Sequence, residues 1–216
     1  MWKEILKAPP SWEVDISDLP PKTRIALSKE KKITPRKYTQ RFSKPNGLWY
    51  SFSDEYNWME WLKDSMPDWD SNYDHMITFD ITGRILTFTS QKDFTDFINK
   101  YGTLPEKSEI DIIWEKHFDY ANVPNLLMKW DEVAQDYDVL EFDYHPSFAD
   151  YDIPNKFNGK VFWVRNLDIK SGVVLNTSAV KNQKLIASRT DKTKTIPHQW
   201  DEDRTQEVYD WKKNVT

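Results

Sequence analysis

A pair of carboxylates two residues apart is the feature of this sequence with the clearest chemical potential. Glu141 and Asp143 lie in the segment 137–144, YDVLEFDY, in which apolar and polar residues alternate. Side chains at positions i and i+2 of a β-strand point to the same side, so this segment predicts a strand with one polar and one apolar face. Two acids so close repel each other, raise the pKa of one, and are able to bind a cation or polarise a hydroxyl. The alternative is a solvent-facing strand edge without chemistry.

A second candidate is the aromatic segment 44–62, KPNGLWYSFSDEYNWMEWL. Pro45-Asn46-Gly47 predicts a turn, because proline fixes the entry dihedral and glycine tolerates positive φ. Residues 48–52 predict a short strand, and Ser53 is expected to cap the helix that follows. That helix would have one apolar face, formed by Trp58, Trp61 and Leu62. The strand would present Trp49, Tyr50 and Ser51 at its end, unless these residues are simply part of the core.

The composition limits the possible classes of protein. The chain has 216 residues, of which 15% are aromatic and 30% charged, enough for one good-sized domain. Its net charge of −5 argues against a surface that coats nucleic acid. The absence of cysteine excludes disulfides, thiolate nucleophiles and cysteine zinc sites. No apolar run is long enough for a membrane span, and the first residues do not resemble a signal peptide, so we expect a cytoplasmic protein without membrane contact.

Strand and helix patterns alternate unevenly along the chain, which predicts an α+β fold. The expected strands, besides those above, are residues 24–28, 75–80, 85–89, 160–164 and 172–175. The expected helices are 90–102, 110–117, 125–136 and 204–213. We divide the chain into an extended, proline-containing N-terminal arm, a main domain and a polar C-terminal tail, at residues 1–22, 23–180 and 181–216.

Two charged segments allow more than one interpretation. The connection 29–44 is rich in lysine and arginine, and it is either a solvated loop or a loop that meets phosphates. The segment 64–74 is rich in aspartate, but it lacks the central glycine and terminal glutamate of an EF-hand loop. We therefore expect no metal site. His117 and His145 are single histidines beside aromatic residues, a setting more typical of structural than of catalytic histidines.

Together these segments resemble the ADP-ribosyltransferase superfamily in its diphtheria-toxin-like branch. More narrowly, the chain is similar to bacterial and phage proteins that share a K-P-x-G-L-W-x-S segment, here Lys44–Ser51. Two weaker segments, A-x-x-Y-D-x-(apolar) and W-D-x-x-S-G-x-x-(W/L), correspond to Ala134–Leu140 and to LDIKSGVVL at Leu167–Leu175. The resemblance extends from about Arg24 to Asn176.

The resemblance implies a split β-sheet core, with mixed and antiparallel strands and flanking helices, and NAD in a cleft. It implies that Glu141 is the acid that stabilises the positively charged ribose, with Asp143 as its neighbour and Asp168 as a rival. It further implies that NAD is bound by Arg24, Ser28, Arg36, Trp49, Tyr50 and Ser51. The sequence departs from the family on the first strand, where the expected histidine is Ala26. Arg24 or Arg36 are the substitutes, because a guanidinium binds phosphates well.

The implied function is transfer of ADP-ribose from NAD to a macromolecule, either a protein or a nucleic acid, or cleavage of NAD by water. Such chemistry needs no metal and no thiol. If the protein is phage-encoded, it would act in the cytoplasm of the host cell. The alternative is an inactive binding or inhibitor protein of the same fold that engages a host partner through its acidic, tryptophan-rich surface.

Overall fold

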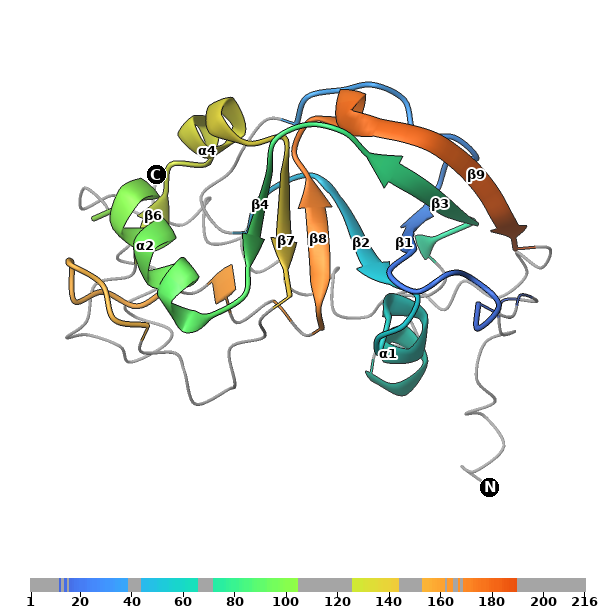
Figure 1. Ribbon diagram of the computed structural model, residues 1–216, viewed down its shortest axis with the longest axis horizontal. Coiled ribbons are helices and arrows are strands. Elements are labelled where there is room, and N and C mark those ends of the chain that lie inside the picture. The colour runs from blue at the N-terminus through green and yellow to red at the C-terminus, as the bar shows by residue number, and fades with distance from the viewer. Residues whose placement is uncertain are drawn as a thin grey trace, which may run out of the picture.

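The computed structural model describes residues 16–38, 44–65, 72–104, 126–143, 153–161 and 169–189, together with Trp12, Val14, Trp163, Val164 and Leu167. One large mixed sheet dominates this part of the chain (Figure 1). Its seven strands lie in the order β4-β7-β8-β2-β1-β3-β9. Their bounds are β1 Arg24–Ser28, β2 Leu48–Phe52, β3 His75–Ile81, β4 Ile85–Phe88, β7 Val139–Phe142, β8 Ser171–Val174 and β9 Val180–Ser188.

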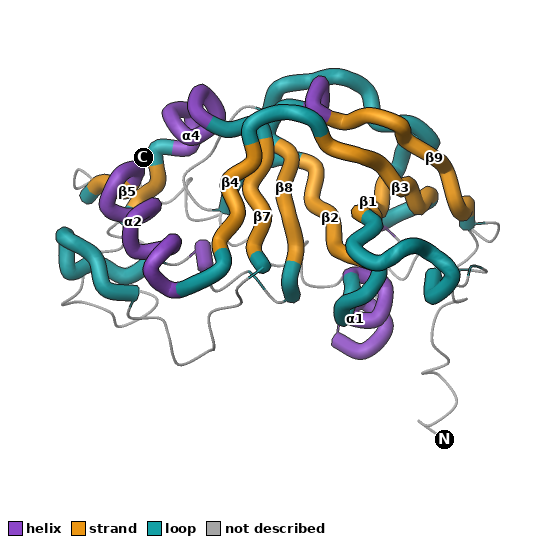
Figure 2. Tube along the Cα trace, in the orientation of Figure 1, coloured by secondary structure: helices purple, strands orange, loops and turns teal. Residues whose placement is uncertain are grey.

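The β4 and β7 strands pair in parallel, and every other neighbouring pair in the large sheet is antiparallel. Few helices accompany the sheet (Figure 2). Their bounds are α1 Trp58–Ser65, α2 Gln91–Tyr101, α4 Trp130–Asp136 and the short 3-10 helix η3 Thr177–Ala179. The α2 and α4 helices lie beside the β4 end of the sheet, and α1 follows β2 at the lower edge of the view. The expected α+β class with a mixed sheet is confirmed.

The sheet separates two hydrophobic cores. Along β7, Val139 belongs to one core while Leu140 and Phe142 belong to the other, because successive strand residues point to opposite faces. We call these the Tyr50 face and the Trp49 face, after the β2 residues that point to each. The expectation that segment 137–144 has one polar and one apolar face is therefore wrong for β7. Both faces are covered, and Glu141 is a charged residue on a largely buried face.

Helix α1 begins later than the sequence suggests. Ser53 does not cap it, because its hydroxyl donates to the backbone oxygen of Pro20 and accepts from the backbone N–H of Thr23. Asn57 is the cap instead: its side-chain oxygen accepts from the backbone N–H groups of Met59 and Glu60, at 3.0 and 3.3 Å. The Glu60 carboxylate accepts from Asn57 in return, which completes a reciprocal cap.

Three other segments differ from the sequence prediction. Residues 127–128 form β6, which pairs with β5 (Gly102–Thr103), so the helix expected from residue 125 begins only at Trp130. The described residues of 160–164 form no strand, since Trp163 and Val164 lie in a 3-10 turn. In contrast, β9 continues the sheet to Ser188, into the segment expected to be a polar tail. The expected helices at 110–117 and 204–213 lie outside the described residues.

The turn at Thr82-Gly83 joins two strands that are not neighbours. It leads from β3 to β4, which lie near opposite ends of the strand order. Gly83 has φ 138°, a backbone conformation that favours glycine, and an added Cβ would lie 2.9 Å from the Asp138 carboxylate. That carboxylate accepts from the backbone N–H and the Nε of Arg84. The turn is thus attached to the start of β7, which brings β4 alongside it.

The start of α2 depends on one carboxylate. Asp93 Oδ2 accepts from the backbone N–H groups of Thr89 and Ser90, at 2.7 and 2.9 Å, and from both of their hydroxyls. These hydrogen bonds favour the ionised form, so the pKa of Asp93 is lowered from its ordinary value. The helix expected over residues 90–102 is confirmed as α2, and its buried face includes Phe94, Phe97 and Ile98.

We expect Asp93→Ala to lower the free energy of unfolding by about 1 kcal/mol, because the four donors at the helix start lose their acceptor. The matched control is Asp96→Ala on the same helix, which removes an exposed ion pair with Lys92 and should change stability by less than about 0.5 kcal/mol. Urea denaturation at pH 7 measures both. Equal losses in the two variants would show that the hydrogen bonds at the helix start do not stabilise it.

The effect of Asp93→Ala should also depend on pH. The pKa of Asp93 is lower in the folded than in the unfolded chain, so its stabilisation is present above the unfolded pKa of about 4 and is lost as pH falls through the folded pKa. The difference in unfolding free energy between wild type and variant should therefore shrink between pH 5 and pH 2, roughly the range in which a stabilised carboxylate becomes protonated. A constant difference over that range would contradict the assignment.

Candidate functional site

Three residues that are far apart in the sequence meet on the Tyr50 face. The Nε and Nη2 atoms of Arg24 lie 2.9 and 2.8 Å from Glu141 Oε1. The hydroxyl of Tyr50 donates to the same oxygen at 2.8 Å. One carboxylate oxygen thus accepts from a guanidinium and a phenol. We call these three residues the Arg24–Tyr50–Glu141 cluster.

The strand register explains why the cluster forms. Glu141 on β7 is opposite Gly172 on β8, Gly172 is opposite Tyr50 on β2, and β1 continues this row with Ala26. Gly172 has no side chain, so the ring of Tyr50 lies over it and reaches Glu141. A Cβ at Gly172 would lie 2.2 Å from Tyr50 Cζ and 2.4 Å from its hydroxyl oxygen. The cluster therefore requires glycine at this position.

Burial and charge fix the protonation of the cluster. Burial of the Tyr50 hydroxyl, together with the negative charge of Glu141, raises its pKa well above the ordinary value, so Tyr50 remains a hydrogen-bond donor. Burial disfavours the charge of Arg24, but the attraction of Glu141 outweighs it, and the pKa of Arg24 is raised. The Arg24 and Glu141 side chains are 24% and 13% exposed, so solvent still reaches the ion pair.

The first-strand position at which the family pattern expects histidine carries no polar group. Ala26 is completely buried in the core of the Tyr50 face. Arg24, two residues earlier on β1, points to the same face and supplies the cation. A positive group thus reaches Glu141 from β1, although from a different position.

Trp49 and Ser51 do not join the cluster, because they alternate with Tyr50 and point to the Trp49 face. Ser51 is buried, and its hydroxyl accepts from the backbone N–H of Trp58 at 3.1 Å. The Trp49 ring stacks on Phe142, with centroids 6.0 Å apart. The Lys44 ammonium lies 3.8 Å from the centre of the Trp49 ring. The three β2 residues expected from the family resemblance to bind NAD, Trp49, Tyr50 and Ser51, are therefore divided between two faces.

Two further candidates for NAD binding lie away from Glu141. Ser28 is at the other end of β1 from Arg24, about 13 Å away at the rise of a strand, and its hydroxyl accepts from the backbone N–H of Glu30. Arg36 lies in the basic connection, where its Nε donates to the hydroxyl of Tyr38 at 3.1 Å.

The two acids expected to act as a pair bind different cations. Glu141 accepts from Arg24, whereas Asp143, just beyond β7, lies 3.3 Å from the ammonium of Lys170. Lys170 also binds Glu55 at 2.9 Å. Asp143 therefore belongs to an exposed ionic contact at the end of the strands. Asp168 lies outside the described residues.

Sequence reasoning missed the importance of Gly172. It noted this residue only within the segment LDIKSGVVL, although glycine inside a strand often marks the close approach of another group. That signal was present, but the approaching group was not readable from the sequence. In the part of the chain that the structure describes, no three His, Asp or Glu side chains are placed to hold a metal ion.

Comparisons of the chain with protein-family models, with curated proteins and with solved structures found no match. Within the described residues, no helix has both the length and the apolar character needed to cross a bilayer. The geometry of the Arg24–Tyr50–Glu141 cluster is therefore the main basis for a functional proposal.

We expect Gly172→Ala to lower the free energy of unfolding by about 1–3 kcal/mol, because the new methyl group overlaps the buried Tyr50 ring. A double-mutant cycle with Tyr50→Val identifies the cause, since removing the ring removes the overlap. Gly172→Ala should then cost much less in the Tyr50→Val background, as measured by chemical denaturation. If the two losses simply add, the ring of Tyr50 is not what excludes a side chain at position 172.

Proposed function

We propose that the protein is an NAD-dependent transferase of the ADP-ribosyltransferase type, with Glu141 as its catalytic carboxylate. The observation that carries this proposal is the meeting of a first-strand arginine, a second-strand tyrosine and a late glutamate on one face of a mixed sheet. The family resemblance assigned site residues to the same three strands. The large mixed sheet is compatible with the split-sheet core of that superfamily.

The reaction breaks the bond between nicotinamide and the ribose C1′ and forms a bond from C1′ to the acceptor. Nicotinamide leaves with the electron pair, and the acceptor loses a proton to water or to Glu141. Positive charge develops on the ribose, and the carboxylate of Glu141 would stabilise it. Tyr50 is buried and donates to Glu141, so it would hold the carboxylate in a fixed orientation as a positioning residue.

Arg24 would act as the anchor for the diphosphate of NAD. Its side chain is 24% exposed, and its planar guanidinium is able to exchange one carboxylate oxygen for phosphate oxygens. Phe52 is opposite Arg24 on β2, half-buried on the same face, and packs edge-on against Tyr50 at 5.7 Å. We assign to Phe52 an aromatic contact with the nicotinamide ring of NAD, in place of Trp49, which points to the opposite face.

A second candidate function is a catalytically inactive binding protein on the same scaffold. The observation that favours it is that the three residues of the cluster already bind one another. Glu141 is only 13% exposed, and its partner Arg24 already neutralises it. Transfer requires NAD to displace that ion pair, whereas a binding protein would keep it as a structural contact.

Glu141→Gln should abolish nicotinamide release and transfer of label from NAD to acceptors in a cell lysate. A loss of about 100-fold or more is expected for removal of a group that stabilises the transition state. The matched control is Glu132→Gln on α4, which removes an exposed carboxylate paired with Lys129 and should leave the rate unchanged. Circular dichroism and thermal melts establish that both variants are folded.

The two candidate functions give different results with the wild-type protein. A transferase releases nicotinamide and is stabilised by NAD in a thermal melt. Neither effect is expected of an inactive binding protein. Full activity in a folded Glu141→Gln variant would refute the assignment of the acid, even if the protein cleaves NAD.

A further inference from the structure

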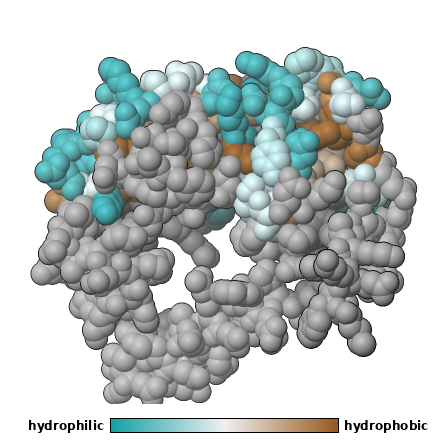
Figure 3. All heavy atoms as spheres, turned by 90° about the horizontal axis from the view of Figure 1, so that it is seen from below, coloured by the Kyte–Doolittle hydropathy of each residue, from teal (hydrophilic) through white to brown (hydrophobic). Residues whose placement is uncertain are grey.

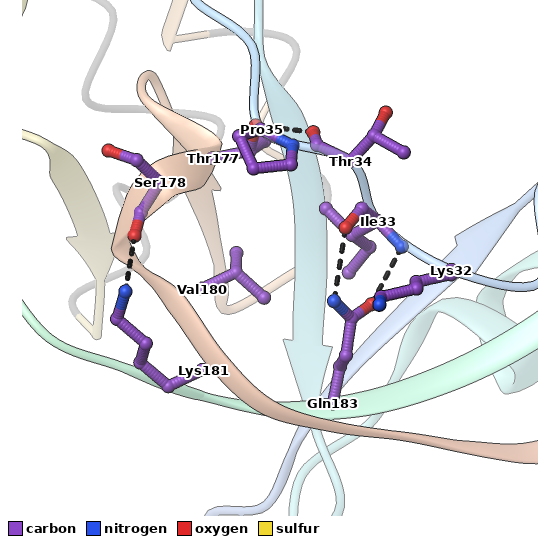
Figure 4. A pocket seen from close by; sticks show the side chains of 9 residues that line it. All are labelled: Lys32, Ile33, Thr34, Pro35, Thr177, Ser178, Val180, Lys181 and Gln183. Atoms are coloured by element: carbon purple, nitrogen blue, oxygen red, sulfur yellow. Dashed lines mark hydrogen bonds between the residues drawn. The ribbon is translucent and has the colours of Figure 1, made fainter.

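A cavity of about 400 Å³ lies between the basic connection and the start of β9 (Figure 4). Residues 32–35 line it from one side and residues from 177–183 line it from the other. Ile33 and Val180 are buried in the core of the Tyr50 face and give the cavity an apolar base. Its volume is within the range of pockets that bind small molecules.

Hydrogen bonds fix the loop that forms this cavity at two places. The Gln183 side chain accepts from the backbone N–H of Ile33 at 2.7 Å and donates to its carbonyl oxygen at 3.0 Å. The buried hydroxyl of Thr177 lies 2.8 Å from the carbonyl oxygen of Thr34 and accepts from the backbone N–H of Arg36 at 2.6 Å. The cavity is thus preformed, and a ligand would not have to order the loop.

Positive charge is concentrated around the cavity in a chain whose net charge is −5. Residues 29–37 contain five cations and a single acid, Glu30. Lys32 and Lys181 belong to the cavity lining and are exposed, and Lys181 donates to the carbonyl oxygen of Ser178. Asp80 of β3 is opposite Lys181 in the strand register, and its carboxylate accepts from the side chain of Asn182. In Figure 4, Val180 lies between the side chain of Lys181 and those of Lys32 and Gln183.

We propose that this cavity binds a small phosphorylated ligand of the nucleoside monophosphate class. Lys32 and Lys181 would contact the phosphate as charge-assisted donors. The apolar base formed by Ile33, Pro35 and Val180 would receive the ring system. An inorganic phosphate alone would leave this base uncovered, and an uncharged nucleoside would leave the lysines without their anion.

This site is separate from the Arg24–Tyr50–Glu141 cluster, so the proposal does not rest on the proposed function. The cavity lies beyond the start of β7, where Asn176 binds the carbonyl oxygen of Asp138. Glu141 is three residues beyond Asp138, about 10 Å further along the strand. Binding at the cavity should therefore be unchanged in Glu141→Gln.

The test is isothermal titration of the full chain with AMP, inorganic phosphate and adenosine in low salt. AMP should bind more tightly than either of the other two probes. The double variant Lys32→Gln/Lys181→Gln should weaken AMP binding by about tenfold or more, because two charged donors are lost. The control Lys92→Gln/Lys129→Gln removes the same charge elsewhere and should leave binding unchanged.

Thr34→Trp provides a second variant, which fills the cavity from an exposed position and retains both lysines. It should also abolish AMP binding. Three results would overturn the proposal: no AMP binding by wild type, equal binding by the lysine variant and its control, or binding of a dT10 oligonucleotide in preference to AMP. Preferential binding of the oligonucleotide would indicate a nucleic-acid surface. No AMP binding by wild type would indicate that the lysines of β9 only keep the edge of the sheet from pairing with another chain.

Discussion

The carboxylate of Glu141 needs partners from the neighbouring strands, and this need constrains the residues at the centre of the sheet. It sits on a largely covered face, where an unpaired charge is costly, and it is matched by a guanidinium from β1 and a phenol from β2. Those partners reach it only because Gly172, on the strand between, presents no side chain. One glycine therefore permits a polar contact across four neighbouring strands, β7, β8, β2 and β1.

The Tyr50 face of the sheet has two different surroundings along its length. Near the end of β7 it holds the Arg24–Tyr50–Glu141 cluster, and toward the start of β7 it is covered by the basic connection. Thr177 and Gln183 attach that connection through side-chain to backbone hydrogen bonds. A polar loop is held over an apolar core in this way, and the cations of its first part, residues 29–37, are exposed. Figure 3, which views the molecule from below, shows hydrophobic residues interspersed with hydrophilic ones toward the right of the view.

The Trp49 face has a different character. It contains the larger core, in which aromatic rings from β4, α2, β7 and the turn at Trp163 pack together. Trp49 and Ser51 contribute to this side through a stacked ring and a hydrogen bond to α1. Their roles are therefore in packing and in attachment of the helix. The chemistry that we propose is confined to the other face.

The sequence by itself determined the local elements of this protein. Alternation and β-branched or aromatic content located β1, β2, β3, β4 and β8, and the start and end signals located α2. It also identified Arg24, Tyr50 and Glu141 as candidates, the last from its strand pattern and all three from a family resemblance. Such features depend on neighbours within a few residues, so they are readable along the chain.

Only the tertiary structure decided which candidates meet. Register and alternation brought Tyr50 to Glu141 and sent its neighbours Trp49 and Ser51 to the opposite face. Pairing with β5 shortened the helix expected from residue 125, and pairing with β3 made a strand of a segment that reads as a polar tail. Strand pairing joins residues as far apart in the sequence as Leu48 and Val174, and a one-residue shift in register would reverse every face. No pattern within a single segment contains that information.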